Sequence, residues 1–290
     1  MNRVIGLAVT LLLAGGAFGR VAAEEAKGAD TEYRKILADD DALMQQMDQE
    51  GGKTSWLTQS MLKARLRRLE GEYKSFLQQY PDHVRGIVAY GGFLRDMQRD
   101  DEAISWWKKA IALDPRCAVA YNNLGEVLGH DGHAGDALRL HQKAYELDPS
   151  DPLFHFNWAT TCIVYRKDAR DVYGWKEDEI FRHSLDQFRI ARDLAPQDFQ
   201  YSSAYAESFY MMKNPDWQEA YAGWNYCLGQ PLQDGDRQRV YGQLARVCIH
   251  LKQVDTARQW INKMDSTDNQ SMRKVLERRL AELVASTPKQ

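Results

Sequence analysis

The residues with the clearest capacity for chemistry are histidines grouped around a short run of turn-forming residues. His130, Asp131 and His133 fall within four positions, and His141 follows eight residues later. Imidazole and carboxylate side chains together suit zinc or a similar ion. Exposed histidines also occur in ordinary turns between helices, and the chain has no HExxH sequence. We therefore predict no metal ion and no cofactor.

A second candidate for chemistry is the triplet Gly52-Lys53-Thr54, which is similar to the end of a phosphate-binding P-loop. A P-loop needs another glycine five residues before Gly52, and that position is Met47. A break between helices at the glycine and a helix cap at the threonine explain the triplet without a nucleotide. The sequence also contains no GxSxG, GxGxxG or protein-kinase motif. These observations predict that the protein is not an enzyme.

A regular spacing of prolines indicates the elements that carry these residues. Pro81, Pro115 and Pro149 lie 34 residues apart. Two of them end nearly identical sequences, Ala110-Ile-Ala-Leu-Asp-Pro115 and Ala144-Tyr-Glu-Leu-Asp-Pro149. Because proline cannot continue a helix, each period should be a helix–turn–helix unit that ends at its proline.

Two of these units share a detailed pattern. In each, a large residue and a glycine on the first helix precede an alanine, a ring, a second alanine and a proline. The residues are Tyr90, Gly91, Ala103, Trp107, Ala110 and Pro115 in Val84–Cys117, and Leu124, Gly125, Ala137, His141, Ala144 and Pro149 in Ala118–Asp151. This pattern resembles the tetratricopeptide repeat (TPR), whose period is 34 residues. The resemblance implies an all-α right-handed solenoid of about five to six repeats with a C-terminal capping helix.

The rest of the chain follows the pattern more loosely. Pro196 ends a further copy, but it lies 47 residues after Pro149, so the fourth unit carries 13 extra residues near 166–178. We predict a TPR array over residues 84–271, a degenerate first repeat or N-terminal cap over 53–83, and a capping helix and tail over 272–290.

The two N-terminal segments do not follow the repeat pattern. Residues 1–23 combine a positive start, an apolar run and a Val21-Ala22-Ala23 cleavage sequence, which predicts a secretory signal peptide. An uncleaved anchor is the alternative, although the run is shorter than the ~20 residues of a spanning helix. The polar segment 24–52 is either a short helix or mobile. We expect a periplasmic or secreted protein with no transmembrane segment after cleavage.

Composition supports a folded, exported chain that binds no nucleic acid. Apolar residues make up 44% of the sequence, which supplies a sizeable core. Removing residues 1–23 takes two arginines and no acids from the net charge of −3 and leaves −5, whereas nucleic acid requires a basic face. The four cysteines form no CxxC pair. Cys227 and Cys248, on neighbouring predicted helices, form either a disulfide or two small core thiols.

The resemblance also implies a peptide-binding groove lined by the first helix of each unit. Carried over one residue at a time, its positions are Arg85, Val88, Gly92, Arg95, Asn122, Asn123, Glu126, Phe156, Asn157, Thr160, Arg239, Gln243 and Arg246. An asparagine amide both donates to and accepts from an extended peptide backbone, which favours capture by Asn123 and Asn157. Asparagine also has a structural role at these positions. Val88 replaces a basic residue of the carboxylate clamp of chaperone-binding TPRs, which argues against that ligand.

The insertion offers a second surface through Tyr173 and Trp175. These rings either anchor a partner or fold back onto the array, and we favour folding back because large aromatic side chains rarely stay exposed. The sequence thus predicts an exported TPR scaffold or adaptor that binds a protein or peptide of unknown identity. A cell-envelope assembly or structural factor is the alternative, and an enzyme or enzyme subunit has less support.

Overall fold

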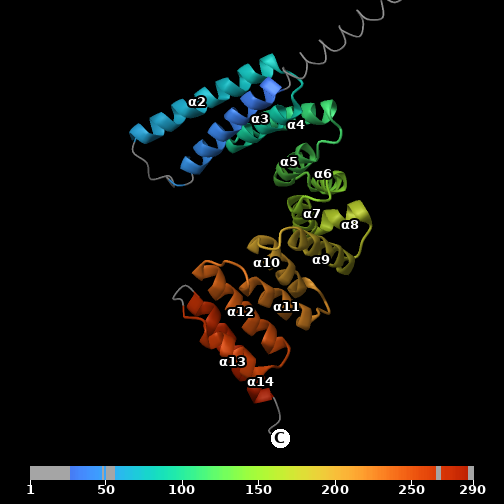
Figure 1. Ribbon diagram of the computed structural model, residues 1–290. Helices are drawn as coiled ribbons and strands as arrows, with labels where there is room; N and C mark the ends of the chain where they lie inside the picture. The colour runs from blue at the N-terminus through green and yellow to red at the C-terminus, as the bar shows by residue number, and fades with distance from the viewer. Residues whose placement is uncertain (1–26, 48, 50–55, 266–268, 287–290) are drawn as a thin grey trace, which may run out of the picture. The chain divides into compact units, whose positions relative to one another are not determined.

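The computed structural model describes residues 27–47, 49, 56–265 and 269–286, and the predicted signal peptide at 1–23 lies outside them. Within these ranges every regular element is a helix, beginning with a helix over 27–47 (Figure 1). The elements that follow are α2 (Trp56–Gln79), α3 (Val84–Asp96), α4 (Asp100–Leu113), α5 (Ala118–His130), α6 (Ala134–Leu147), α7 (Pro152–Val164), α8 (Arg166–Tyr173), α9 (Glu177–Leu194), α10 (Phe199–Ser208), the 3-10 helix η1 (Phe209–Met211), α11 (Trp217–Leu228), α12 (Asp234–His250), α13 (Val254–Asn262) and α14 (Gln270–Ser286). None of these described helices combines the length and the apolar character needed to cross a bilayer.

Two compact units divide the chain, residues 1–123 and residues 124–290, with the boundary inside α5. The first unit begins with the helix over 27–47, which buries one residue every three or four positions: Ala29, Tyr33, Ile36, Asp40 and Leu43. This spacing places the buried side chains on one helix face. The Tyr73 hydroxyl of α2 donates to Asp40 Oδ2 at 2.6 Å. The described part of segment 24–52 is therefore a helix that belongs to the core of the first unit.

The α3–α4 hairpin shows why the repeat places a glycine opposite a ring. A Cβ on Gly91 would overlap the Trp107 ring at Nε1, so glycine lets the two helices approach this closely. Trp107 is fully buried and donates to the Val88 carbonyl at 3.1 Å. The Val88 side chain is 9% exposed and belongs to the core, which corrects its predicted place in the groove.

Paired helices continue through the second unit. α7 packs against α9, α10 against α11, and α12 against α13. Trp158, Tyr205 and Trp224 belong to their shared apolar core. α14 packs against α12 and α13 and buries Leu276 and Leu280. The second unit is thus built from helical hairpins, with one further helix at its C-terminal end.

The thiols of Cys227 and Cys248 are free and fully buried. Burial raises the pKa of Cys227 to about 12 and the pKa of Cys248 to about 11. Of the two predicted alternatives, the structure shows the small core thiols. Both side chains stay protonated at neutral pH and act as apolar residues.

The insertion in the fourth repeat forms α8 and then reverses direction at Gly174. Gly174 has φ 70°, a left-handed conformation that favours glycine at the end of a helix. The Tyr173 hydroxyl accepts from Trp158 Nε1 at 2.9 Å, and its ring stacks on Trp175 with 4.4 Å between centroids. The Trp175 ring also stacks on His183 at 4.1 Å. Both rings fold back onto the second unit and are partly buried there.

Candidate functional site

A cavity of about 200 Å³ lies between α5, α6 and α7 in the second unit. Three residues predicted to face a groove, Glu126, Asn157 and Thr160, share its wall. The complete lining is Gly125, Glu126, Gly129, His130, His141, Asn157, Thr160, Thr161, Val164 and Tyr165. The structure therefore brings part of the predicted site together at one place.

Gly125 and His141 set the approach of α5 and α6 at this cavity. A Cβ on Gly125 would lie 2.6 Å from His141 Cδ2, which repeats the relation between Gly91 and Trp107. The His141 ring also has polar atoms that can bond to a neighbouring helix. Its Nδ1 lies 2.8 Å from Thr161 Oγ1. The imidazole thereby links α6 to α7.

The hydrogen bonds of Thr161 define the tautomer of His141. The Thr161 hydroxyl donates its only proton to the Asn157 carbonyl at 2.7 Å. Thr161 must therefore accept from His141, so Nδ1 carries a proton. His141 and Thr161 are 4% and 7% exposed, and this chain of hydrogen bonds holds one wall of the cavity in place.

Tyr165 holds the opposite end of the cavity. Its hydroxyl donates to the Gly129 carbonyl at 2.7 Å and ties the residue after α7 to the last turn of α5. Val164, the last residue of α7, is 62% exposed and offers an apolar contact in the lining. The sequence prediction missed Val164, Thr161 and Tyr165, although an aromatic residue directly before the insertion is a signal for a contact at this edge.

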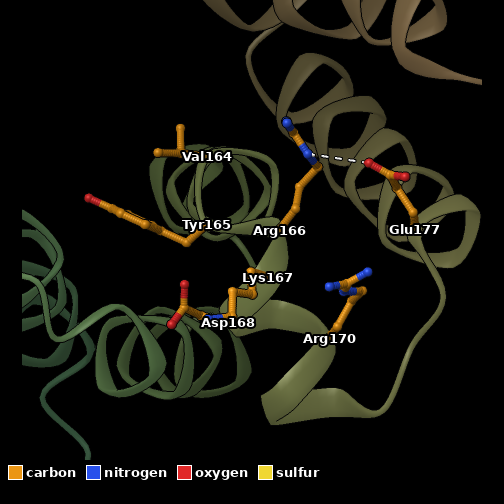
Figure 2. A pocket seen from close by; sticks show the side chains of 7 residues that line it. All are labelled: Val164, Tyr165, Arg166, Lys167, Asp168, Arg170 and Glu177. Atoms are coloured by element: carbon orange, nitrogen blue, oxygen red, sulfur yellow. Dashed lines mark ion pairs between the residues drawn. The ribbon is translucent and has the colours of Figure 1, made fainter.

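A second hollow of about 370 Å³ shares Val164 and Tyr165 with the cavity and extends onto the insertion. Figure 2 shows Arg166 reaching toward Glu177, and the two side chains form an ion pair at 3.5 Å. Both members are about half exposed, at 48% and 60%, so solvent weakens their attraction. Lys167, Asp168 and Arg170 complete the lining. The spacing of the prolines predicted the insertion, but no residue pattern predicted this hollow.

Two predicted groove residues are buried. Asn122 is 2% exposed and donates to Asn123 Oδ1 at 3.3 Å, and Gln243 is 8% exposed. The prediction that these two side chains face a partner is wrong, because α5 and α12 turn them into the protein. Asn123 is half-buried and does not belong to the cavity lining.

Three predicted arginines contact other side chains of the chain. Arg85 Nη1 lies 3.5 Å from Asp30 Oδ1, and Arg95 donates to the neighbouring carboxylate at 3.1 Å. The Arg246 guanidinium lies 4.0 Å from the centre of the Tyr210 ring. These three cations therefore take part in contacts within the protein.

Two remaining groove positions also have internal partners. The Phe156 ring lies 5.6 Å from the Phe188 ring and 5.3 Å from the Tyr201 ring, and it packs against the core of the second unit. Arg239 Nη2 pairs with Glu207 Oε2 at 3.1 Å. Across the part of the chain that the structure describes, no three histidine, cysteine, aspartate or glutamate side chains gather as a metal-binding group.

Comparisons with known proteins identify the fold. Residues 93–132 match the TPR repeat family. YrrB, whose solved structure is described as that of a TPR protein with an unusual peptide-binding site, superimposes with a TM-score of 0.57 at 13% identity, covering 71% of this chain and 97% of that one. The Pseudomonas aeruginosa pilF structure gives 0.53 at 14% identity and covers 87% and 100%. These likenesses show the all-α TPR-type solenoid fold, which confirms the fold predicted from the resemblance.

Sequence relatives match only a short part of the chain. The CTR9 homolog of Arabidopsis thaliana is 32% identical over 84 residues, which are 27% of this chain and 8% of that protein. This chain spans about a tenth of the length of the curated relatives that it matches. Solenoid folds of this type present extended concave surfaces that can bind other molecules.

Proposed function

We propose that the protein is an exported scaffold or adaptor that holds an extended segment of a partner protein at the cavity between α5, α6 and α7. The observation that carries this proposal is the convergence of Glu126, Asn157 and Thr160 on that cavity. The three residues come from the first helices of two successive repeats. A bound segment that contacts all three runs from one repeat to the next.

The chemistry of the lining suits a peptide backbone. The Asn157 amide can donate to and accept from the same peptide unit, and the Thr160 hydroxyl can do either. Both side chains are half-buried, so a hydrogen bond to them is partly shielded from water. Capture of a backbone by such groups tolerates many partner sequences.

Helix contacts and hydrogen bonds within the protein hold the walls of the cavity. Gly125 fixes the helix approach, Thr161 links His141 to the Asn157 carbonyl, and Tyr165 bonds to Gly129. A preformed site loses less conformational entropy on binding than one that must be ordered. The arrangement therefore supports binding with little rearrangement of α5, α6 and α7.

The size of the cavity favours a protein partner over a metabolite. Sites for small molecules usually enclose roughly 300–1,000 Å³. The cavity holds about 200 Å³, which fits one side chain of a longer segment that continues over the surface. The typical role of the fold as a scaffold agrees with binding in place of catalysis.

Export is the second part of the proposal and rests on the sequence of residues 1–23. Mass spectrometry of the protein purified from its source tests this part. We expect a mature N-terminus at Glu24, after Val21-Ala22-Ala23. A purified protein that still begins at Met1 would contradict cleavage.

A photoreactive amino acid at Thr160 tests the binding site directly. We expect the mature protein carrying benzoylphenylalanine there to crosslink to a partner protein in an extract of its source cells. The control position is Lys143, an exposed residue of α6 outside the lining. Equal crosslinking from both positions would contradict the assignment.

Two asparagines of the sequence prediction provide a matched pair of variants. Asn157→Ala removes an amide from the cavity, whereas Asn123→Ala removes one that lies outside the lining. We expect Asn157→Ala to lower the crosslinking yield from Thr160 several-fold and Asn123→Ala to leave it unchanged. A crosslinking yield that falls in Asn123→Ala but not in Asn157→Ala would place the groove elsewhere.

A further inference from the structure

The hollow of about 370 Å³ beside the cavity lies where α7 ends and the insertion forms α8 (Figure 2). Its lining holds three cations, Arg166, Lys167 and Arg170, and two carboxylates, Asp168 and Glu177. We propose that this hollow binds one aspartate or glutamate side chain of the partner segment, with Lys167 and Arg170 as the donors. The inference rests on the proposed function and names the chemistry of a second part of the bound segment.

The first of the three cations already has partners within the protein. Arg166 Nε lies 3.5 Å from Glu177 Oε1, and its Nη1 donates to the Ile163 carbonyl at 3.0 Å. The same guanidinium lies 6.0 Å from the centre of the Phe181 ring. Arg166 and Glu177 therefore neutralise each other and form one edge of the hollow.

The other two cations have no such partners. In the ranges that the structure describes, neither Lys167 nor Arg170 forms an ion pair or a side-chain hydrogen bond. Both side chains are exposed, and their spacing of three residues places them on the same side of α8. Once Arg166 and Glu177 are paired, Asp168 is the one carboxylate left among the described lining residues. The hollow thus carries one positive charge in excess.

This excess of one charge favours a single carboxylate. A phosphate group carries close to two negative charges, which is more than the hollow can neutralise. The net charge of −3 on the whole chain opposes an extended polyanion such as nucleic acid. A lysine ammonium has three donors and an arginine guanidinium has five, so both cations can donate to the same carboxylate. Such charge-assisted hydrogen bonds are stronger than those between neutral groups.

The position of the hollow determines where the acidic residue lies in the partner segment. Val164 and Tyr165 line both the hollow and the cavity between α5, α6 and α7. Val164 is largely exposed, so the methylene groups of the incoming side chain can cover it. A segment that crosses the cavity toward the insertion therefore places its acidic residue directly after the part that the cavity holds.

The cations belong to the insertion and not to the regular repeat. Arg166, Lys167 and Arg170 all lie on α8, within the 13 extra residues of the fourth unit. The preference for an acidic residue is therefore a property of this chain, whereas capture of a peptide backbone depends on the helices of the repeats. The two properties can be removed separately.

Arrays of nine-residue peptides test this inference. The central residue is fixed as glutamate, glutamine, phosphoserine or lysine, the other positions are randomised over uncharged residues, and the arrays are probed with labelled mature protein. We expect the glutamate array to retain about fivefold more protein than the glutamine array, as two exposed ion pairs would give. The lysine array should retain the least, because its central residue meets like charges.

Variants of α8 separate the charge from the fold. Lys167→Gln and Arg170→Gln should each lower glutamate retention about twofold, and the double variant should lower it to the level of the glutamine array. Lys167→Arg keeps the charge and should keep the preference for glutamate. The control is Lys143→Gln, which changes the net charge equally at an exposed position of α6 outside both linings, and it should leave glutamate retention unchanged.

Several outcomes would overturn the acidic occupant and leave peptide binding in place. These are equal retention on the glutamate and glutamine arrays, the highest retention on the phosphoserine array, and a loss in Lys143→Gln as large as that in Arg170→Gln. A loss of glutamine retention in the variants of α8 would show general damage to the site and would also overturn the inference. Retention on no array, together with no crosslink from Thr160, overturns both this inference and the proposed function.

Discussion

The α3–α4 hairpin of the first unit and the α5–α6 hairpin of the second use the same glycine-and-ring contact for different purposes. In the first, Trp107 is fully buried and its only polar atom is bonded to Val88 within the hairpin. In the second, His141 bonds outward to α7 and borders a cavity. The repeat fixes how closely the helices approach, and the type of ring decides whether the contact closes the core or opens a site.

We expect the two hairpins to differ most in the free energy of unfolding that is lost when the ring is removed. Trp107→Ala removes a large buried side chain and should lower the free energy of unfolding by about 3–5 kcal/mol. His141→Ala removes a smaller ring and one hydrogen bond to Thr161 and should cost about 1–3 kcal/mol. Urea denaturation followed by circular dichroism measures both. Equal costs would mean that His141 is as much a core residue as Trp107.

The glycines give the next largest effect. Gly91→Ala places a Cβ against the enclosed Trp107 ring and should cost about 1–3 kcal/mol. Gly125→Ala should cost less, because the His141 ring borders the cavity and has room to move. Gly92→Ala is the control, since its Cβ meets nothing within 4 Å. That variant should gain up to about 1 kcal/mol from helix propensity.

A loss in Gly92→Ala as large as that in Gly91→Ala would show that the close approach to the ring is not the cause. A Gly125→Ala variant that is destabilised as much as Gly91→Ala would show that the His141 ring is equally fixed. Both measurements use the same denaturation experiment.

Asp40 gives the first unit a pH dependence. Burial raises the pKa of Asp40, although the Tyr73 hydrogen bond opposes that rise. The stabilising contribution of the neutral carboxyl is therefore complete below the unfolded pKa, roughly 3.9, and is lost as the pH rises through the higher native pKa. Asp40→Asn keeps an acceptor for Tyr73 and removes the titration. We expect the stability of the variant relative to wild type to rise from pH 3.5 to pH 7.

Melting temperatures of wild type and Asp40→Asn across this range provide the test. Curves that run parallel from pH 3.5 to pH 7 would contradict a raised native pKa for Asp40.

The smallest expected change in stability is at the cavity itself. Val164 is 62% exposed, so Val164→Ser should alter the free energy of unfolding by no more than about 0.5 kcal/mol. Loss of the apolar contact should nevertheless lower the yield of the partner crosslink from benzoylphenylalanine at Thr160. A variant with unchanged stability and unchanged crosslinking would remove Val164 from the site.

The glycine–ring contacts could be predicted from the sequence because they depend on residues that are close along the chain. Gly91 and Trp107, like Gly125 and His141, belong to single hairpins whose spacing the period of 34 residues fixes. The helix over 27–47 was harder to recognise. One of its buried positions is Asp40, within a run of three acids that is typical of an exposed segment, and only the contact with Tyr73 accounts for its burial.

The candidate site could be predicted only in part. Glu126, Asn157 and Thr160 meet at the cavity, but Asn122 and Gln243 are buried, because transfer of a repeat pattern assumes one rotation for every helix. Local packing sets that rotation. Val164 and Tyr165 lie where the insertion begins, and no corresponding position of the regular repeat contains that information.

The sharpest test of partner binding at this cavity is crosslinking from benzoylphenylalanine at Thr160, with Asn157→Ala and Asn123→Ala compared side by side. We expect a partner adduct that weakens several-fold in Asn157→Ala and persists in Asn123→Ala. An adduct that survives the loss of Asn157, or that forms equally well from Lys143, would contradict binding at the cavity between α5, α6 and α7.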